Sequence, residues 1–448
     1  MKLEKLKSII LTVLVGISLV LTYIQWTYQP GYEAYSEEND LIQSVAISEE
    51  KTIGEVVKPT KFLIHRNSGT FGTSNINEIK EVLDNFTKWK FSDMSDITVT
   101  ISDNEFFPLV HGTDNVEFIF EDSVPLNMYS KVLKFTENHI PSGNFDRIVV
   151  DMGKFDGNQV TVYFISYLKN ERKIYQARAT GTDISKFQTK YYQIPQRFPA
   201  YNYYEVEDIR RVYYPSNEND EVRVFTYKFL SDTVDADLFR DALFSNPNFV
   251  KKRYVTGGEE YSDIYSLLSV DYSKSSLSFV NPIGASDSYL QVPDALQKSI
   301  NYINEHAGWT DTFIYDSWSK YENKISFRLF HQGLPVFSEK GQTAIEVIWG
   351  SEEIYQYTRP YFDLKNHLRL ELETEEVSLP SGDYVLQQLE KQKQIDLKDL
   401  QDLTIGYKIE YDYQNPVISL EPTWYYLLAG SWLSITFNEE GGDKHGLE

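Results

Sequence analysis

The chain has 448 residues, more than one hydrophobic core usually holds, and its hydrophobic (41%) and charged (24%) fractions are those of a folded globular protein. It contains no cysteine, which excludes disulfide bonds, thiolate zinc sites and a cysteine nucleophile. Its formal net charge of −23 disfavours contact with nucleic-acid phosphates, so we expect no nucleic acid among its partners.

The first distinct element is an uncharged segment from Ser8 to Tyr32, whose residues 9–24 are mostly Ile, Leu and Val. Its length matches the roughly 20 residues that a helix needs to cross a bilayer. We therefore predict a cytoplasmic tail at residues 1–7 and a single transmembrane helix at residues 8–28. A cleaved signal peptide is the alternative. It is disfavoured because the apolar run is long and no small-x-small cleavage site closes it.

The charges that flank this predicted helix indicate its orientation. Lysines precede it and the first charges after it are acidic, so the positive-inside rule places the N-terminus in the cytoplasm. We expect a single-pass protein of the cell membrane, anchored in the lipid bilayer, with an extracellular body. The residues expected at the membrane interfaces are Lys5, Lys7, Tyr23, Trp26 and Tyr28.

Small side chains recur within the predicted helix at Ser8, Thr12 and Gly16. The spacing of four residues places them on one helix face, where a second helix can approach closely. We predict that this face contacts a partner's transmembrane helix. The alternative is that small and hydroxyl residues fall in this pattern by chance.

The exported part is predicted to be a multi-domain α+β body of antiparallel sheets with flanking helices, since 33 Tyr and 26 Phe favour strands. We place an N-terminal extracytoplasmic α+β domain at residues 34–198. Asn75 followed by Glu78 predicts a helix start with a capping box. The other elements predicted in this domain are strands at 97–102, 116–121, 147–152, 160–168 and 173–180, and a helix at 126–137.

A stretch rich in proline and tyrosine, residues 195–215, predicts a break in the chain. We place a central α+β domain at 199–288, a C-terminal α+β domain at 289–438 and a frayed polar tail at 439–448. Helices are predicted at 235–244, 292–305 and 381–393. Similar tyrosine-containing hairpins follow helices in both domains, so we predict that the two are related. Chance similarity between such hairpins is the alternative.

The search for chemistry finds no local catalytic or binding motif. The seven histidines are scattered and show no paired metal-ligand spacing, although residues distant in sequence can still assemble in space. No phosphate-binding glycine loop and no nucleophile elbow is present. With 66 acidic residues, a glycosidase-like carboxylate pair is uninformative from sequence. We therefore predict no catalytic residue, no cofactor and no metal.

Three runs near the N-terminus are specific: residues Lys5 to Thr12, Ser18-Leu19-Val20-Leu21-Thr22 and above all Trp26-Thr27-Tyr28-Gln29-Pro30. Together they resemble the start of the YycH (WalH) family. The Leu334-Pro335-Val336-Phe337 segment and the overall size are compatible with it. The resemblance implies a regulator of the WalK (YycG) sensor histidine kinase of Gram-positive bacteria.

The resemblance further implies a membrane complex with a sister protein, YycI, whose exported part resembles the last two YycH domains. Regulation in the family is attributed largely to transmembrane helices and controls cell-wall metabolism. We therefore expect a non-enzymatic regulator of a two-component-system kinase. Two alternatives stay open: a surface ligand-binding sensor module and a cell-wall-acting hydrolase.

Overall fold

The computed structural model describes residues 14–18, 49–137, 140–167, 171–206, 210–216, 221–230, 232–284, 292–306, 308–350, 353–364, 371–392, 395–412 and 417–435. The chain divides into two compact units, Met1–Ser44 and Val45–Glu448, and we call the second the body. In the first unit residues 14–18 are helical. No helix among the described residues is both long and apolar enough to cross a membrane. Most of the predicted span 8–28, and the tails 1–7 and 439–448, lie outside the described residues.

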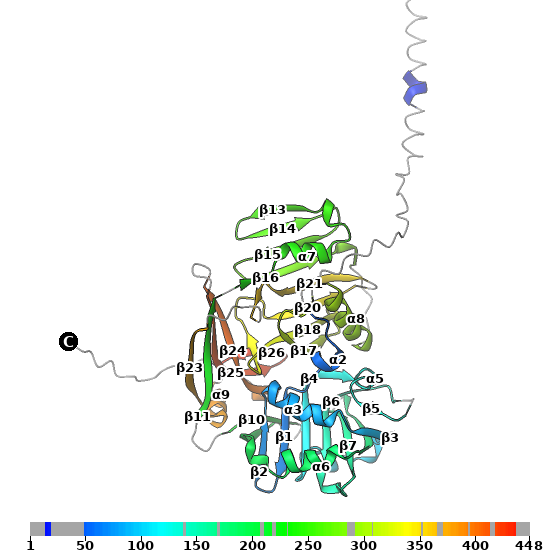
Figure 1. Ribbon diagram of the computed structural model, residues 1–448, viewed down its shortest axis with the longest axis vertical. Helices are drawn as coiled ribbons and strands as arrows, with labels where there is room; N and C mark the ends of the chain where they lie inside the picture. The colour runs from blue at the N-terminus through cyan, green and yellow to red at the C-terminus, as the bar shows by residue number, and fades with distance from the viewer. Residues whose placement is uncertain are drawn as a thin grey trace, which may run out of the picture. The chain divides into compact units, whose positions relative to one another are not determined.

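The body begins with a ten-stranded sheet, which we call the first sheet, in the order β10-β9-β2-β1-β4-β6-β7-β8-β3-β5 (Figure 1). Its strands are β1 Lys61–Arg66, β2 Gly69–Thr73, β3 Lys90–Asp96, β4 Asn115–Pro125, β5 Lys134–Phe135, β6 Asn144–Asp151, β7 Gln159–Ser166, β8 Lys173–Thr180, β9 Ala200–Val206 and β10 Arg210–Pro215. The helices of this part are α2 Ile53–Val56, α3 Ile76–Phe86, α4 Asp103–His111, α5 Leu126–Tyr129 and α6 Asp183–Phe187.

Both faces of the first sheet are covered, because successive side chains of a strand point to opposite faces. Ile148 and Val150 of β6 pack in the core that includes α3 and α6, which lie over the same face in Figure 1. Val149, between them, packs instead with Phe106 and Val110 of α4. The second face, under α4, is the one on which the candidate site is built.

The rest of the body forms a fourteen-stranded sheet, the second sheet, in the order β13-β14-β15-β16-β21-β20-β18-β19-β24-β25-β11-β23, with β17 on β18 and β26 on β25. Its strands are β11 Glu221–Leu230, β13 Lys251–Val255, β14 Gly258–Ser262, β15 Leu267–Asp271, β16 Ser276–Val280, β17 Thr312–Ser319, β18 Lys324–His331, β19 Leu334–Phe337, β20 Ala344–Trp349, β21 Ile354–Pro360, β23 Glu371–Pro380, β24 Leu400–Asp412, β25 Val417–Leu428 and β26 Ser431–Ser434. Beside them are the small pair β12 Asp232–Thr233 and β22 Phe362–Asp363, and the helices α7 Ala236–Leu243, α8 Val292–Glu305 and α9 Gly382–Lys391.

Most predicted elements of the body are confirmed, and two are wrong. Asn75 caps α3 by accepting a hydrogen bond from the Asn77 N–H at 2.9 Å. The predicted capping box with Glu78 is not formed, because the Asn75 N–H donates to Thr73 Oγ1 instead. The strand predicted at 97–102 is instead a 3₁₀ turn, after which a capping box of Ser102 and Glu105 begins α4. The helix predicted at 126–137 ends at Tyr129, because the chain then pairs in parallel with β3 as β5.

Sheet membership does not follow the predicted division at residue 288. β11 pairs with β23 and β25, and β16 pairs with β21, so strands from 199–288 and from 289–438 share the second sheet. β9 and β10 belong to the first sheet. The domain bounds and the relation between the two parts remain predictions about how the chain is organised.

Candidate functional site

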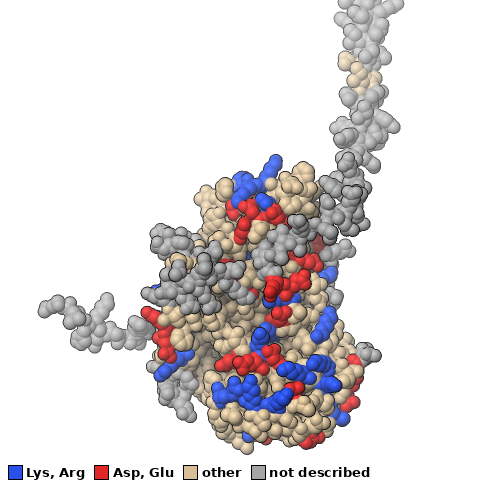
Figure 2. Space-filling model, in the orientation of Figure 1, with Lys and Arg blue, Asp and Glu red and all other residues tan. Residues whose placement is uncertain are grey.

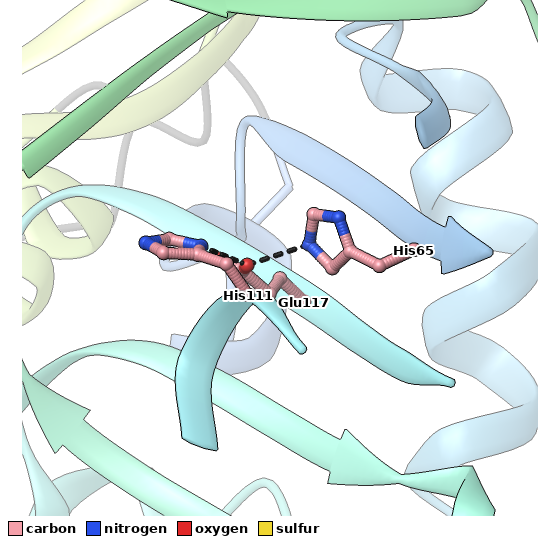
Figure 3. Close-up of side chains that lie close together, drawn as sticks. All are labelled: His65, His111 and Glu117. Atoms are coloured by element: carbon pink, nitrogen blue, oxygen red, sulfur yellow. Dashed lines mark hydrogen bonds and ion pairs between the residues drawn. The ribbon is translucent and has the colours of Figure 1, made fainter. Parts of the chain in front are cut away.

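Three side chains that are distant in sequence meet in the body: His65 in β1, His111 at the end of α4 and Glu117 in β4 (Figure 3). Glu117 Oε1 lies 2.6 Å from His65 Nε2 and 2.6 Å from His111 Nδ1. Leu63 is directly opposite Glu117 across β1 and β4, so His65, two residues further along, shares the face of Glu117. All three side chains are buried, Glu117 completely.

Every ring nitrogen of the two histidines has a hydrogen-bond partner. His65 Nδ1 lies 3.0 Å from Thr70 Oγ1, and His111 Nε2 lies 2.7 Å from the Tyr167 hydroxyl. If each ring donates its N–H to Glu117, the two hydroxyls donate to the remaining nitrogens. The Tyr167 oxygen also accepts the backbone N–H of Arg211 at 3.1 Å. With the rings placed in this way, each of these four hydrogen bonds has one donor and one acceptor.

Arg147 supplies the charge that balances Glu117. Its Nη1 donates to Glu117 Oε2 at 2.9 Å, and its guanidinium carbon lies 3.8 Å from the centre of the Tyr167 ring. We call His65, His111, Glu117, Arg147 and Tyr167 the buried network. Such a set ties β1, β4, α4, β6 and the chain after β7 together, since each member loses its partner if one element moves.

Burial and charge set the protonation states in the buried network. Burial lowers the pKa of His111 to about 4, with Glu117 opposing the shift, so this imidazole is neutral at pH 7. Burial raises the pKa of Glu117, but His111 and His65 outweigh it and hold that pKa well below its usual range. Burial lowers the pKa of Arg147, but the attraction of Glu117 and its neighbours exceeds this effect, so that the pKa is raised overall. The network thus holds one buried carboxylate–guanidinium pair.

Two imidazoles and a carboxylate also form a donor set suited to zinc, and their ligand atoms all lie within 4.8 Å of one another. Their geometry fits a hydrogen-bonded network better. Zinc sits about 2.0–2.2 Å from each such ligand, so atoms that are now 2.6 Å apart would have to separate. The guanidinium of Arg147 on the same carboxylate also opposes a cation.

This interpretation predicts how the protein responds to zinc. Because the facing atoms of His65, His111 and Glu117 are already joined through protons, we expect purified full-length protein to hold well under one metal ion per chain. We also expect its Tm to be the same in excess zinc and in excess EDTA. Elemental analysis and thermal unfolding measure both. Stoichiometric zinc together with a raised Tm would contradict the prediction.

A polar cavity of about 590 Å³ lies between the two sheets, and Arg147 and Tyr167 of the buried network form part of its lining. Strands β4, β6 and β10 contribute from the first sheet, and β17, β18, β20 and β24 from the second. Figure 2 shows acidic and basic side chains interspersed across the middle of the visible face. The volume lies within the range of ligand sites in proteins.

Polar contacts join the two sheets around this cavity. Lys61 of β1 is buried, forms an ion pair with Asp402 of β24 and donates to the Tyr213 carbonyl at 3.3 Å. Asp122 Oδ2 accepts the Trp318 N–H at 2.7 Å, which joins β4 to β17. These contacts hold the walls of the cavity in place.

Three carboxyl groups of the lining, those of Glu121, Asp122 and Asp146, have raised pKa values. Burial, followed by the charges of Asp402 and Asp316, raises the pKa of Glu121 to about 7, against the opposing effect of Lys61. Burial also raises the pKa of Asp146 to about 6, with Arg147 opposing it. Perturbed carboxyl groups inside a cavity are typical of binding and catalytic sites, although structural clusters show them too.

Only one of the predicted site residues lies within the described part of the chain. Gly16 lies in the helical segment 14–18, and a Cβ atom built on it meets nothing within 4 Å. The residues predicted with it, Ser8 and Thr12 on the contact face and Lys5, Lys7, Tyr23, Trp26 and Tyr28 at the interfaces, lie outside the described residues. The buried network was not predicted, because no local spacing in the sequence links its members.

Comparisons with known proteins cover nearly the whole chain. The family model described as "YycH protein, N-terminal domain" matches residues 4–194, and "YycH protein, C-terminal domain" matches residues 210–442. The "Two-component system WalR/WalK regulatory protein YycH" of Bacillus subtilis (strain 168) is 24% identical over 466 residues, covering 100% of both chains. A crystal structure of YycH from Bacillus subtilis matches the fold with a TM-score of 0.73 at 20% identity, covering 87% of this chain and 98% of that chain.

Proposed function

Because this chain belongs to the YycH family, we propose that it is a non-enzymatic, membrane-anchored regulator of a WalK/YycG-like sensor histidine kinase. The observation that supports this most is the full-length likeness to a relative named as a regulatory protein of the WalR/WalK system. We further propose that it acts in a membrane complex with a YycI-like sister protein and thereby controls cell-wall metabolism. The uncharged N-terminal segment supports an anchor, and the acidic composition suits an exported body.

The proposed mechanism needs only modest energies. An anchor confines both proteins to the plane of the membrane, which raises their effective concentration toward each other. Contact between transmembrane helices then favours one arrangement of the kinase over another. A coupling of about 1–3 kcal/mol changes an equilibrium roughly 5–150-fold, which is enough to regulate a kinase.

The division of the chain into two units suggests the first test. Full-length protein, the unit Met1–Ser44 and an exported body Val45–Glu448 would each be expressed in a strain that lacks the protein and reports kinase output. We expect the full chain and the first unit to change the output and the body alone to have no effect. Restoration by the body alone would contradict regulation through the anchor.

Gly16→Leu tests the predicted contact face directly. We expect this variant to reduce the amount of kinase that co-purifies with the full-length protein, because leucine would keep the partner helix away. A Cβ atom built on Gly16 meets nothing within 4 Å among the described residues, so a defect is expected to arise from the partner. The matched control is Ser18→Leu, which adds the same side chain on another helix face. Equal co-purification of both variants and the wild type would eliminate this face.

The cavity favours a second, additional function as a ligand sensor. Its polar lining comes from both sheets, so an occupant would contact both and could favour one arrangement of the body over another.

A further inference from the structure

Only part of the charge that lines the cavity is paired within the protein. Five ion pairs involve these charges: Lys61 with Asp402, Lys324 with Glu346, Arg328 with Asp316, Arg147 with Glu117, and Arg211 with Glu205. The groups left over all come from the first-sheet side. Among the described residues, those that line the cavity without an ion pair are Arg210 and the acids Glu121, Asp122, Asp146 and Glu171.

The arginines keep unused hydrogen-bond donors. The Nε atoms of Arg147, Arg210 and Arg211 are buried and have no hydrogen-bond partner, and Arg147 as a whole is only 9% exposed. Other atoms of these side chains do have contacts: Arg210 Nη2 donates to the Lys398 carbonyl at 3.3 Å, and Arg211 forms an ion pair with Glu205 at 3.6 Å. A buried donor without a partner is unfavourable, and the planar guanidinium fork suits a carboxylate.

The acids keep unused acceptors. Asp122 accepts the N–H groups of Ser123 and Trp318, and Asp146 accepts the N–H of Tyr167 at 3.1 Å. Within the described residues, neither they nor Glu121 lies within ion-pair distance of a cationic side chain. A partly buried carboxylate without a counter-charge suits an ammonium group of a ligand.

We propose that the cavity binds a small zwitterion of the amino-acid or short-peptide class, with its carboxylate on Arg210 and Arg211 and its ammonium on Glu121 and Asp146. Such a ligand would supply counter-charges to Arg210, Glu121 and Asp146 and a hydrogen-bond acceptor to Arg211, whose Nε has none. A cavity of about 590 Å³ accommodates a molecule of this size. The proposal concerns the body alone and does not depend on regulation of a kinase.

The test is isothermal titration calorimetry, in which each probe is titrated into full-length protein in detergent. The probes are L-alanine, L-alanyl-L-alanine, N-acetyl-L-alanyl-L-alanine and L-alanyl-L-alaninamide, which separate free amino acid from peptide and remove one charge at a time. We expect saturable binding of alanine or its dipeptide. Blocking either end of the dipeptide should weaken binding at least about tenfold.

Variants of the cavity show which side chains bind the carboxylate end and which bind the ammonium end of the ligand. Arg210→Gln should show a smaller preference than the wild type for the dipeptide over its amide, because only Arg211 remains. Glu121→Gln should show a smaller preference for the dipeptide over its acetyl derivative, because only Asp146 remains. Arg253→Gln, on the exposed strand β13, is the matched control and should keep the wild-type preferences. Unfolding curves check that each variant is folded. Absence of saturable binding, equal binding of blocked and free probes, or unchanged preferences in folded variants would each overturn the proposal.

Discussion

Glu117→Gln is expected to lower the free energy of unfolding of the body by about 3–5 kcal/mol, the range found when one partner of a buried ion pair is removed. The carboxylate accepts hydrogen bonds from His65, His111 and Arg147. Glutamine of nearly the same shape keeps one acceptor oxygen and presents an NH₂ group to the other donors. The guanidinium of Arg147 would then stay buried without a counter-charge.

Urea unfolding at pH 7.5, monitored by tryptophan fluorescence, measures this loss. The matched control is Glu375→Gln, the same change at an exposed position of β23, which should alter stability by no more than about 0.5 kcal/mol. If Glu117→Gln were no more destabilising than this control, the buried network would not stabilise the body as argued.

Glu121→Gln is expected to stabilise the body at pH 8 by about 3 kcal/mol and to have little effect at pH 4, since each unit of pKa shift is worth about 1.4 kcal/mol. The folded-state pKa of Glu121 is about 7, against a usual value of 4.5, because of burial and the charges of Asp402 and Asp316. Below pH 4.5 the group is protonated in both states. Between pH 4.5 and 7 only the unfolded chain ionises, so the wild type loses stability as the pH rises.

The measurement is the difference in free energy of unfolding between variant and wild type across this pH window. Taking the difference removes the contributions of titrating groups that do not interact with Glu121, such as His111. The charges that face Glu121 are those of Asp402, Asp316 and Lys61, and the variant keeps all three. A difference that is the same at pH 4 and pH 8 would show that the folded protein does not raise the pKa of Glu121.

Structural features that depend on a few neighbouring residues could be predicted from the sequence. The start of α3 could be predicted because its Asn75 cap depends on short-range hydrogen bonding. The sheet-rich α+β character of the body could be predicted from its many strand-forming residues. The resemblance at residues 5–30 identified the family that the family models match. The single transmembrane helix and its contact face remain predictions.

The candidate site and the make-up of the sheets were decided by tertiary structure alone. His65, His111 and Glu117 meet because β1 pairs with β4 in one register and α4 ends beside them, and strand register depends on which faces are buried across the whole sheet. For the same reason β11 joins β23 and β25 in spite of the long chain between them. Periodicity and capping describe a residue's near neighbours, whereas a buried charge network depends on partners that only the packed chain brings within hydrogen-bond distance.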